Sequence, residues 1–131
     1  MLTSLAYASV SNIPSWSPEM LELARCCLAR NPALGITGAL YFDGDQFYQV
    51  IEGEEDAIRS LYARIRRDPR HQAVQTLWDG PIPQRRFGNW AMKFVDGSGS
   101  GASLRPRFGY SRVLRQPPEG HARLAEALAR A

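Results

Sequence analysis

The chain has no long hydrophobic run and no secretory pattern at its N-terminus. None of its apolar stretches approaches the roughly eighteen residues that a helix needs to cross a bilayer. Its first residues also lack the basic segment followed by an apolar one that a signal peptide requires. We therefore expect a cytoplasmic protein that does not associate with membranes.

Cysteine and histidine are scarce, with two of each among 131 residues. Cys26 and Cys27 are adjacent in an expected helix, where successive side chains point apart, so a disulfide between them is implausible. His71 and His121 have no further Cys or His at ligand spacing. The sequence therefore predicts no disulfide and no metal site.

Charge of one sign is not concentrated anywhere, and the net charge of +3 comes from interspersed arginines and acids. This balance is too mild to indicate a nucleic-acid partner, and the aromatic motif of RNA-binding sheets is missing. Residues 9–15 lack the glycines of a phosphate-binding loop, and no paired carboxylates or activated nucleophile are visible. We expect neither nucleic-acid binding nor enzymatic activity.

What the chain does have is a carboxamide in its most apolar strand. Gln49 lies within residues 47–51, which are otherwise aromatic and β-branched. A buried amide without partners costs about 1–3 kcal/mol, so such a strand seldom carries one without hydrogen-bonding groups nearby. Tyr7 places a phenol in similar surroundings. Taken alone, the two residues favour ordinary backbone or water partners, but on one sheet face they indicate a pocket for a planar polar ligand.

Two amphipathic helices are expected. Residues 17–19 combine a hydroxyl cap, a proline and an early acid, and the apolar stripe that follows ends at an inward Asn31, which alone could be a simple cap. That stripe comprises Met20, Leu23, Ala24, Cys27 and Leu28. The second helix begins at residues 54–56 and ends at 68–69, with acids first and arginines last, an order that the helix dipole explains.

Five strands are expected, at residues 2–10, 36–42, 47–51, 73–77 and 90–95, with Gly53 ending the third. The order β-α-β-β-α-β-β predicts an α+β, ferredoxin-like sheet with both helices on one face. Trp90 and Met92 alternate onto one face of the fifth strand. The groove between the helices would give a ligand access to this face, to Tyr7 and to Gln49.

The C-terminal part is expected to be separate from the core, with a sensor domain at residues 1–96 and a linker and helical tail at 97–131. Residues 97–101 have linker composition, and residues 104–115 are basic and irregular. A short helix follows residues 117–119, and its apolar side needs a surface on which to dock. We expect it to dock through Leu124 and Leu128 on the sheet face opposite the groove. That face would present Tyr41, Tyr48 and Val50.

Dispersed residues of this chain together resemble the BLUF domain, the family of blue-light sensors that use flavin. The residues are Tyr7, Asn31, Gln49, Trp90 and Met92, with the flanking segments 35–38, 49–53, 68–71 and 86–92. The resemblance covers about residues 1–96, in order and without large gaps. Each motif is weak, but five positions at consistent spacing are specific.

The resemblance implies a photoreceptor that holds flavin non-covalently between the helices. Asn31 would bond the pyrimidine edge of the ring, and Gln49 would bridge the flavin and the hydroxyl of Tyr7. After excitation Tyr7 would donate an electron and a proton, and the Gln49 amide would change rotamer or tautomer, giving a red-shifted state that reverts in the dark. FAD is the usual cofactor of the family, with FMN or riboflavin as alternatives.

The resemblance also implies roles at the margin of the pocket. Trp90 and Met92 would compete or cooperate for the place beside Gln49, although plain core packing explains them equally well. The remaining candidate cofactor contacts are Arg30, Asp68, Arg70 and His71. The signal would leave through a homo-oligomer or a separate downstream protein. The alternative is a ferredoxin-like flavin- or small-molecule-binding regulatory module without photochemistry.

Overall fold

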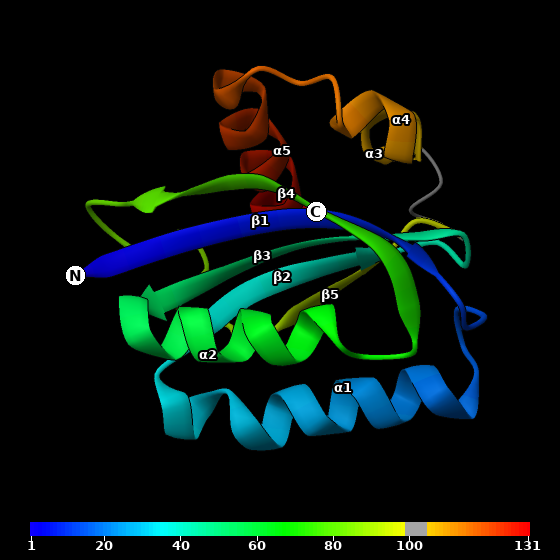
Figure 1. Ribbon diagram of the computed structural model, residues 1–131, viewed down its shortest axis with the longest axis horizontal. Coiled ribbons are helices and arrows are strands. Elements are labelled where there is room, and N and C mark those ends of the chain that lie inside the picture. Colours follow the sequence, from blue (N-terminus) through cyan, green and yellow to red (C-terminus); the bar gives the residue numbers. More distant parts are fainter. Residues whose placement is uncertain (99–104) are drawn as a thin grey trace.

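Two layers of helices enclose a five-stranded sheet in the computed structural model, which describes residues 1–98 and 105–131 (Figure 1). The strands are β1 Leu2–Ser11, β2 Thr37–Phe42, β3 Gln46–Glu54, β4 His71–Pro81 and β5 Lys93–Asp96. The helices are α1 Pro18–Arg30, α2 Glu55–Arg66, α3 Arg105–Phe108, α4 Tyr110–Val113 and α5 Pro118–Arg130, with a 3-10 turn at Pro32–Leu34. Residues 99–101 of the expected linker lie outside the described residues.

The strand order is β4-β1-β3-β2-β5. β1 runs antiparallel to both β3 and β4, β2 runs antiparallel to β3, and β5 runs parallel to β2. This is the split β-α-β arrangement of ferredoxin-like folds, in which α1 and α2 cover one face of the sheet (Figure 1). The predicted α+β class is confirmed. Because Tyr7 pairs with Gln49 across β1 and β3, their side chains lie on the same face.

Side chains alternate along β3 between two separate cores. Phe47 and Ile51 belong to the core beneath α1 and α2, whereas Tyr48 and Val50 belong to the core beneath the tail. The second core includes Leu124 and Leu128 of α5, so the predicted docking of the tail helix on this face is confirmed. Figure 1 shows α3, α4 and α5 on this side of the sheet.

Hydrogen bonds from the sheet help to hold the tail. The carboxamide of Gln46 in β3 donates to the Phe108 carbonyl and accepts from the Tyr110 amide at 2.5 Å. At the C-terminal end of α5, the Lys93 ammonium donates to the Ala129 carbonyl at 3.0 Å, where a cation also complements the helix dipole. The stretch expected to be irregular, residues 104–115, instead includes the short helices α3 and α4.

Several expected boundaries were wrong. β3 continues through Gly53, because Gly53 stays paired with Thr3 of β1. β4 extends to both sides of the predicted 73–77, since its pairing with β1 continues along most of that strand. Leu28, expected on the buried stripe of α1, is 52% exposed. β5 begins only at Lys93, so Trp90 precedes the strand and does not share a buried face with Met92.

Candidate functional site

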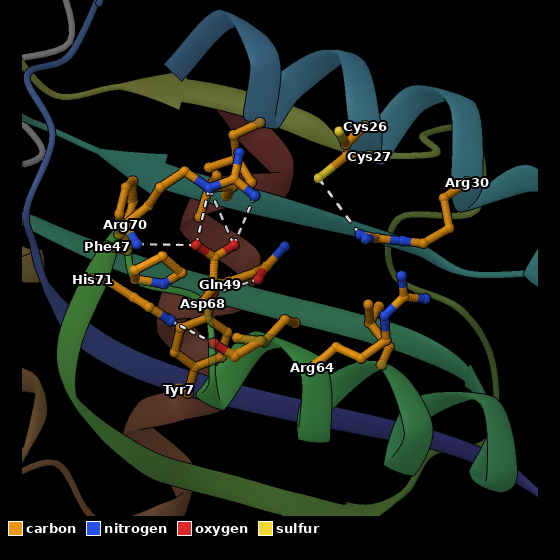
Figure 2. A pocket seen from close by; sticks show the side chains of 15 residues that line it. Tyr7, Cys26, Cys27, Arg30, Phe47, Gln49, Arg64, Asp68, Arg70 and His71 are labelled. Atoms are coloured by element: carbon orange, nitrogen blue, oxygen red, sulfur yellow. Dashed lines mark hydrogen bonds and ion pairs between the residues drawn. The ribbon is translucent and has the colours of Figure 1, made fainter. Parts of the chain in front are cut away.

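A cavity of about 520 Å³ lies between α1, α2 and the sheet (Figure 2). Its floor is formed by side chains of β1, β2 and β3, and its sides by the two helices and the segment that follows α2. The lining residues are Tyr7, Leu23, Cys26, Cys27, Arg30, Leu40, Phe47, Gln49, Leu61, Arg64, Ile65, Asp68, Pro69, Arg70 and His71. The cavity therefore occupies the groove that the strand order predicted.

A hydrogen-bonded chain of three side chains crosses the buried end of this cavity. The Tyr7 hydroxyl donates to the Gln49 carbonyl oxygen at 2.5 Å, and the Gln49 amide nitrogen donates to the Met92 sulfur at 3.5 Å. Burial raises the pKa of Tyr7 well above its usual value, so the phenol keeps its proton. A carboxamide has two N–H groups, and within residues 1–98 and 105–131 only one of them has a partner. The second is available to an acceptor on a ligand.

Met92, and not Trp90, lies beside Gln49. The indole of Trp90 is 49% exposed, with the Lys93 ammonium 5.6 Å from its ring centroid. Trp90 does not line the cavity. The backbone explains this placement, because the Trp90 amide donates to the Phe87 carbonyl at 2.9 Å in a turn that precedes β5.

Asn31 is fully buried at the end of α1, as its inward position on the helix predicted. Its amide nitrogen donates to the Ala91 carbonyl at 2.9 Å, and its oxygen accepts from the Arg30 guanidinium at 3.4 Å. Asn31 thus ties α1 to the segment that carries Met92, although it does not line the cavity. Its contact with a flavin stays a prediction.

His71 lines the cavity with its ring and has both nitrogens engaged. Nε2 lies 2.6 Å from the Ile65 carbonyl, which can only accept, so in the neutral ring Nε2 carries the proton. Nδ1 then accepts from the Ser9 hydroxyl at 2.7 Å. The ring meets Tyr7 edge-on, with centroids 5.9 Å apart. His71 therefore offers a ligand an aromatic surface and no free ring nitrogen. The sequence did not point to Ser9, because an isolated serine in a strand carries no signal of its partner.

Asp68 and Arg70 form an ion pair in the lining of the cavity. The Arg70 guanidinium donates to both carboxylate oxygens of Asp68, the shortest contact being 2.7 Å. Burial raises the pKa of Asp68, but the hydrogen bonds from Arg70 outweigh it, and the pKa lies below its usual value. The pair is therefore charged on both sides at neutral pH.

Two further arginines line the cavity without a carboxylate partner among the described residues. The Arg30 guanidinium contacts the Asn31 oxygen at 3.4 Å and the Cys27 sulfur at 3.9 Å. The Arg64 guanidinium has no hydrogen bond or ion pair within residues 1–98 and 105–131. The helix dipole explained the arginines at the end of this helix, so Arg64 was not predicted as a site residue. The signal was its spacing within α2, because Arg64 follows the lining residue Leu61 by three positions and so lies on the same face of the helix.

The cavity fits a planar aromatic molecule that is bonded along one edge. Aliphatic and aromatic side chains line it, and the Gln49 carboxamide lies at its floor, while Arg30 and Arg64 supply positive charge. The described residues contain no group of three or more His, Cys, Asp or Glu that could hold a metal ion. In the same part of the chain no helix is both long and apolar enough to span a membrane.

Comparison with known proteins identifies the class to which this site belongs. The family model for BLUF, "Sensors of blue-light using FAD", matches residues 2–93. The chain is therefore a member of the BLUF family of flavin-binding blue-light photoreceptors. The resemblance inferred from the sequence is confirmed, and the matched family is one of sensors, whose members bind flavin.

Curated relatives support this assignment over the same segment. The photoactivated adenylate cyclase subunit beta of Euglena gracilis is 39% identical over 94 residues, which are 70% of this chain and 11% of that protein. The blue light- and temperature-regulated antirepressor BluF of Escherichia coli (strain K12) is 34% identical over 96 residues, 73% of this chain and 24% of the relative. The chain thus spans less than a third of the length of these relatives.

Solved structures match over almost the whole chain. The dark-state structure of BlrB, described as a BLUF protein, has a TM-score of 0.80 and 34% identity and covers 98% of this chain and 96% of its own. The photo-activated state of BlsA has a TM-score of 0.79 at 26% identity, covering 100% of this chain and 96% of its own. Both matches extend beyond residue 93 into the tail, so the likeness includes the helices on the second face.

Proposed function

We propose that the chain binds FAD non-covalently in the cavity and senses blue light through Tyr7 and Gln49. The observation that carries this proposal is the hydrogen bond of 2.5 Å from the Tyr7 hydroxyl to the Gln49 carboxamide, which lines the cavity and whose second N–H has no partner in the described residues. The bound flavin supplies blue-light absorption and, when excited, a strong oxidant.

Tyr7 is the residue that gives up an electron and its phenolic proton. A phenol is the more readily oxidised of the two side chains, and its proton already lies on the hydrogen bond to Gln49. Gln49 then exchanges its donor and acceptor ends, or changes tautomer, because a carboxamide offers both functions within one planar group. In a buried site each altered hydrogen bond has a larger effect than in water. The Met92 sulfur, a weak acceptor, leaves the Gln49 nitrogen comparatively free to move.

The arginines at the cavity support a choice of FAD or FMN over riboflavin. Arg30 and Arg64 are cations without a carboxylate partner among the described residues, and either can meet a phosphate or a ring carbonyl. The wall of the cavity between α2 and β4 is formed by Asp68, Arg70 and His71. Asn31 bonds the pyrimidine edge of the flavin. A solved relative, Klebsiella pneumoniae BlrP1, is described with FMN, and has 35% identity and a TM-score of 0.72 over 99% of this chain and 35% of its own.

The light signal leaves through the tail to a partner protein or a second copy of the chain. Residues 1–96 form the sensor domain and 97–131 the linker and tail. Lys93 supports this route, because it follows Met92 directly and its ammonium holds the Ala129 carbonyl of α5. The two unpaired cysteines fit a reducing compartment such as the cytoplasm.

The absorption spectrum of the purified protein tests this function. We expect a yellow protein with extractable FAD and a small red shift under blue light that reverses in the dark. A colourless protein that also fails to take up added flavin would contradict flavin binding. A yellow protein without the shift would instead support the regulatory module without photochemistry. Hydrogen exchange of α5 in darkness and under light separately tests the output route.

A further inference from the structure

A second, smaller cavity lies on the other face of the sheet, beneath α5. Its volume is about 80 Å³, and β1, β3, β4 and α5 contribute to its walls. The polar side chains in its lining include those of Ser4, Tyr48, Arg86 and His121. Nothing in the proposed photochemistry uses this cavity.

Two deeply buried polar atoms of this lining have no partner within residues 1–98 and 105–131. They are the hydroxyl oxygen of Tyr48 and Nδ1 of His121, on side chains of residues that are 1% and 6% exposed. Leaving a buried donor or acceptor without a hydrogen bond is costly, and most such groups have a partner. Two of them in one cavity indicate a third molecule between them.

The two atoms are chemically complementary. Burial raises the pKa of Tyr48, so its hydroxyl keeps its proton and donates. Burial also lowers the pKa of His121, so its ring is neutral at physiological pH. A neutral imidazole has one nitrogen that donates and one that accepts, so Nδ1 is an acceptor in the tautomer that carries its proton on Nε2. In that tautomer the cavity is lined by one unpartnered donor, the Tyr48 hydroxyl, and one unpartnered acceptor.

We propose that this cavity is a binding site for water, and that a water molecule accepts from the Tyr48 hydroxyl and donates to Nδ1 of His121. A bound water needs about 10–15 Å³ and two to four polar partners. The volume of about 80 Å³ satisfies the first need, and Ser4 in the lining can supply a third partner. The charged lining residue, Arg86, lies 3.8 Å from Glu126, so the site favours a neutral molecule over an ion.

This water links the tail to the sheet at a particular place. Tyr48 is next to Gln49 in β3 and points to the opposite face, while His121 lies in the first turns of α5. The bridge therefore holds α5 to the strand that carries the photoactive amide. The site itself is formed by the sheet and the tail alone, so the test of the bound water does not depend on flavin binding.

A high-resolution crystal structure of the full chain in darkness tests the site directly. We expect density for one ordered water within hydrogen-bonding distance of both the Tyr48 oxygen and Nδ1 of His121. Density that is absent there, or a direct bond between the two side chains, would overturn the proposal. Tyr48→Phe should abolish this water while the cavity walls stay in place.

Hydrogen exchange of α5 amides tests the link in solution. Tyr48→Phe and His121→Leu should each speed exchange about tenfold, the factor expected when one buried hydrogen bond is lost. Because both variants break the same bridge, the double variant should also exchange about tenfold faster, and not a hundredfold. Slower exchange in the single variants would show that the two atoms are unpartnered in solution and would contradict the bridge.

A matched control distinguishes the bridge from general weakening of the tail. The Tyr110 hydroxyl donates to the Ala73 carbonyl at 2.5 Å, away from the cavity. The effect of Tyr110→Phe should multiply with that of His121→Leu, because the two act on independent contacts. If the increases in exchange rate caused by Tyr48→Phe and His121→Leu also multiply, no shared water joins the two side chains.

Discussion

The two faces of the sheet use the same strands for different purposes. Toward α1 and α2, Tyr7 and Gln49 stand in an apolar core beside a cavity of about 520 Å³. Toward the tail, Tyr41 and Tyr48 pack against Phe108, with ring centroids 4.5 and 5.2 Å apart, above a cavity of only about 80 Å³. One face holds a ligand-sized space and the other is closed by the protein's own chain.

The difference shows how a small rearrangement on one face can reach the other. Tyr48 and Gln49 are consecutive, so β3 presents the photoactive amide on one side and a tail contact on the other. At the start of β5, Met92 lies in the core on the cavity side, whereas Lys93 reaches α5 on the tail side. Gln49 and Met92 are therefore each next in sequence to a residue that contacts the tail.

The largest expected effect is on photochemistry and is confined to the cavity face. Gln49→Leu should retain the fold and bind flavin but lose the light-induced red shift entirely, because leucine keeps the approximate shape and makes no hydrogen bond. The matched control is Gln46→Leu, the same change in the same strand on the tail face. It should keep the red shift and increase hydrogen exchange in the tail. A normal shift in Gln49→Leu would assign the switch to another residue.

Tyrosine to phenylalanine substitutions make the same comparison for electron donation. Tyr7→Phe should bind flavin and lose the normal photocycle, because phenylalanine is far harder to oxidise and has no proton to give. Tyr48→Phe removes an identical hydroxyl from the other face and should leave the photocycle in place. Time-resolved absorption measures both. A normal yield of the red-shifted state in Tyr7→Phe would refute its role as donor.

The third prediction concerns stability, which we expect to fall more for a substitution in the tail core than for one on α1. Leu128 is completely buried beneath the sheet, and Leu128→Ala should lower the free energy of unfolding by about 2–4 kcal/mol through lost contacts and a new cavity. Leu28→Ala, on the exposed side of α1, should change it by less than about 0.5 kcal/mol. Denaturant unfolding in darkness measures both. Equal effects would mean that the tail core contributes little.

The smallest effect is a dependence of tail docking on pH. Burial lowers the pKa of His121 below its usual value of 6.5, so the unfolded chain binds a proton more readily than the folded one. The stabilisation from the neutral ring is thus complete above pH 6.5 and is lost as the pH falls through the lower folded value. Arg86 is the other charged residue that lines this cavity. Unfolding measured across this range should show a slope that His121→Leu reduces.

The sequence predicted most of the cavity face, because its features are local and periodic. Helical spacing placed Asn31 inward, and strand alternation placed Gln49 in the core. Strand pairing then brought Tyr7 to Gln49, as the order of elements implied. The tail helix was also placed correctly, since its apolar side needed a surface and only one sheet face was uncovered.

What the sequence could not reveal are contacts between segments far apart in the chain. The buried Glu52 accepts from the backbone amides of Arg86 and Phe87. No sequence pattern near Glu52 predicts those partners. The turn they stabilise lies just before Trp90, which was expected within β5. Ser9 with His71 is a similar case, because its meaning depends on a histidine 62 positions away.

The hydrogen bond between Lys93 and Ala129 gives the protein a built-in reporter. Lys93 is the single lysine of the sequence, and its amine is held by the last turns of α5. An amine-reactive reagent therefore meets one side-chain target, and the rate at which Lys93 is modified follows how often α5 detaches. Covalent labelling in darkness and under blue light, read by mass spectrometry, can time the release of the tail without any engineered probe.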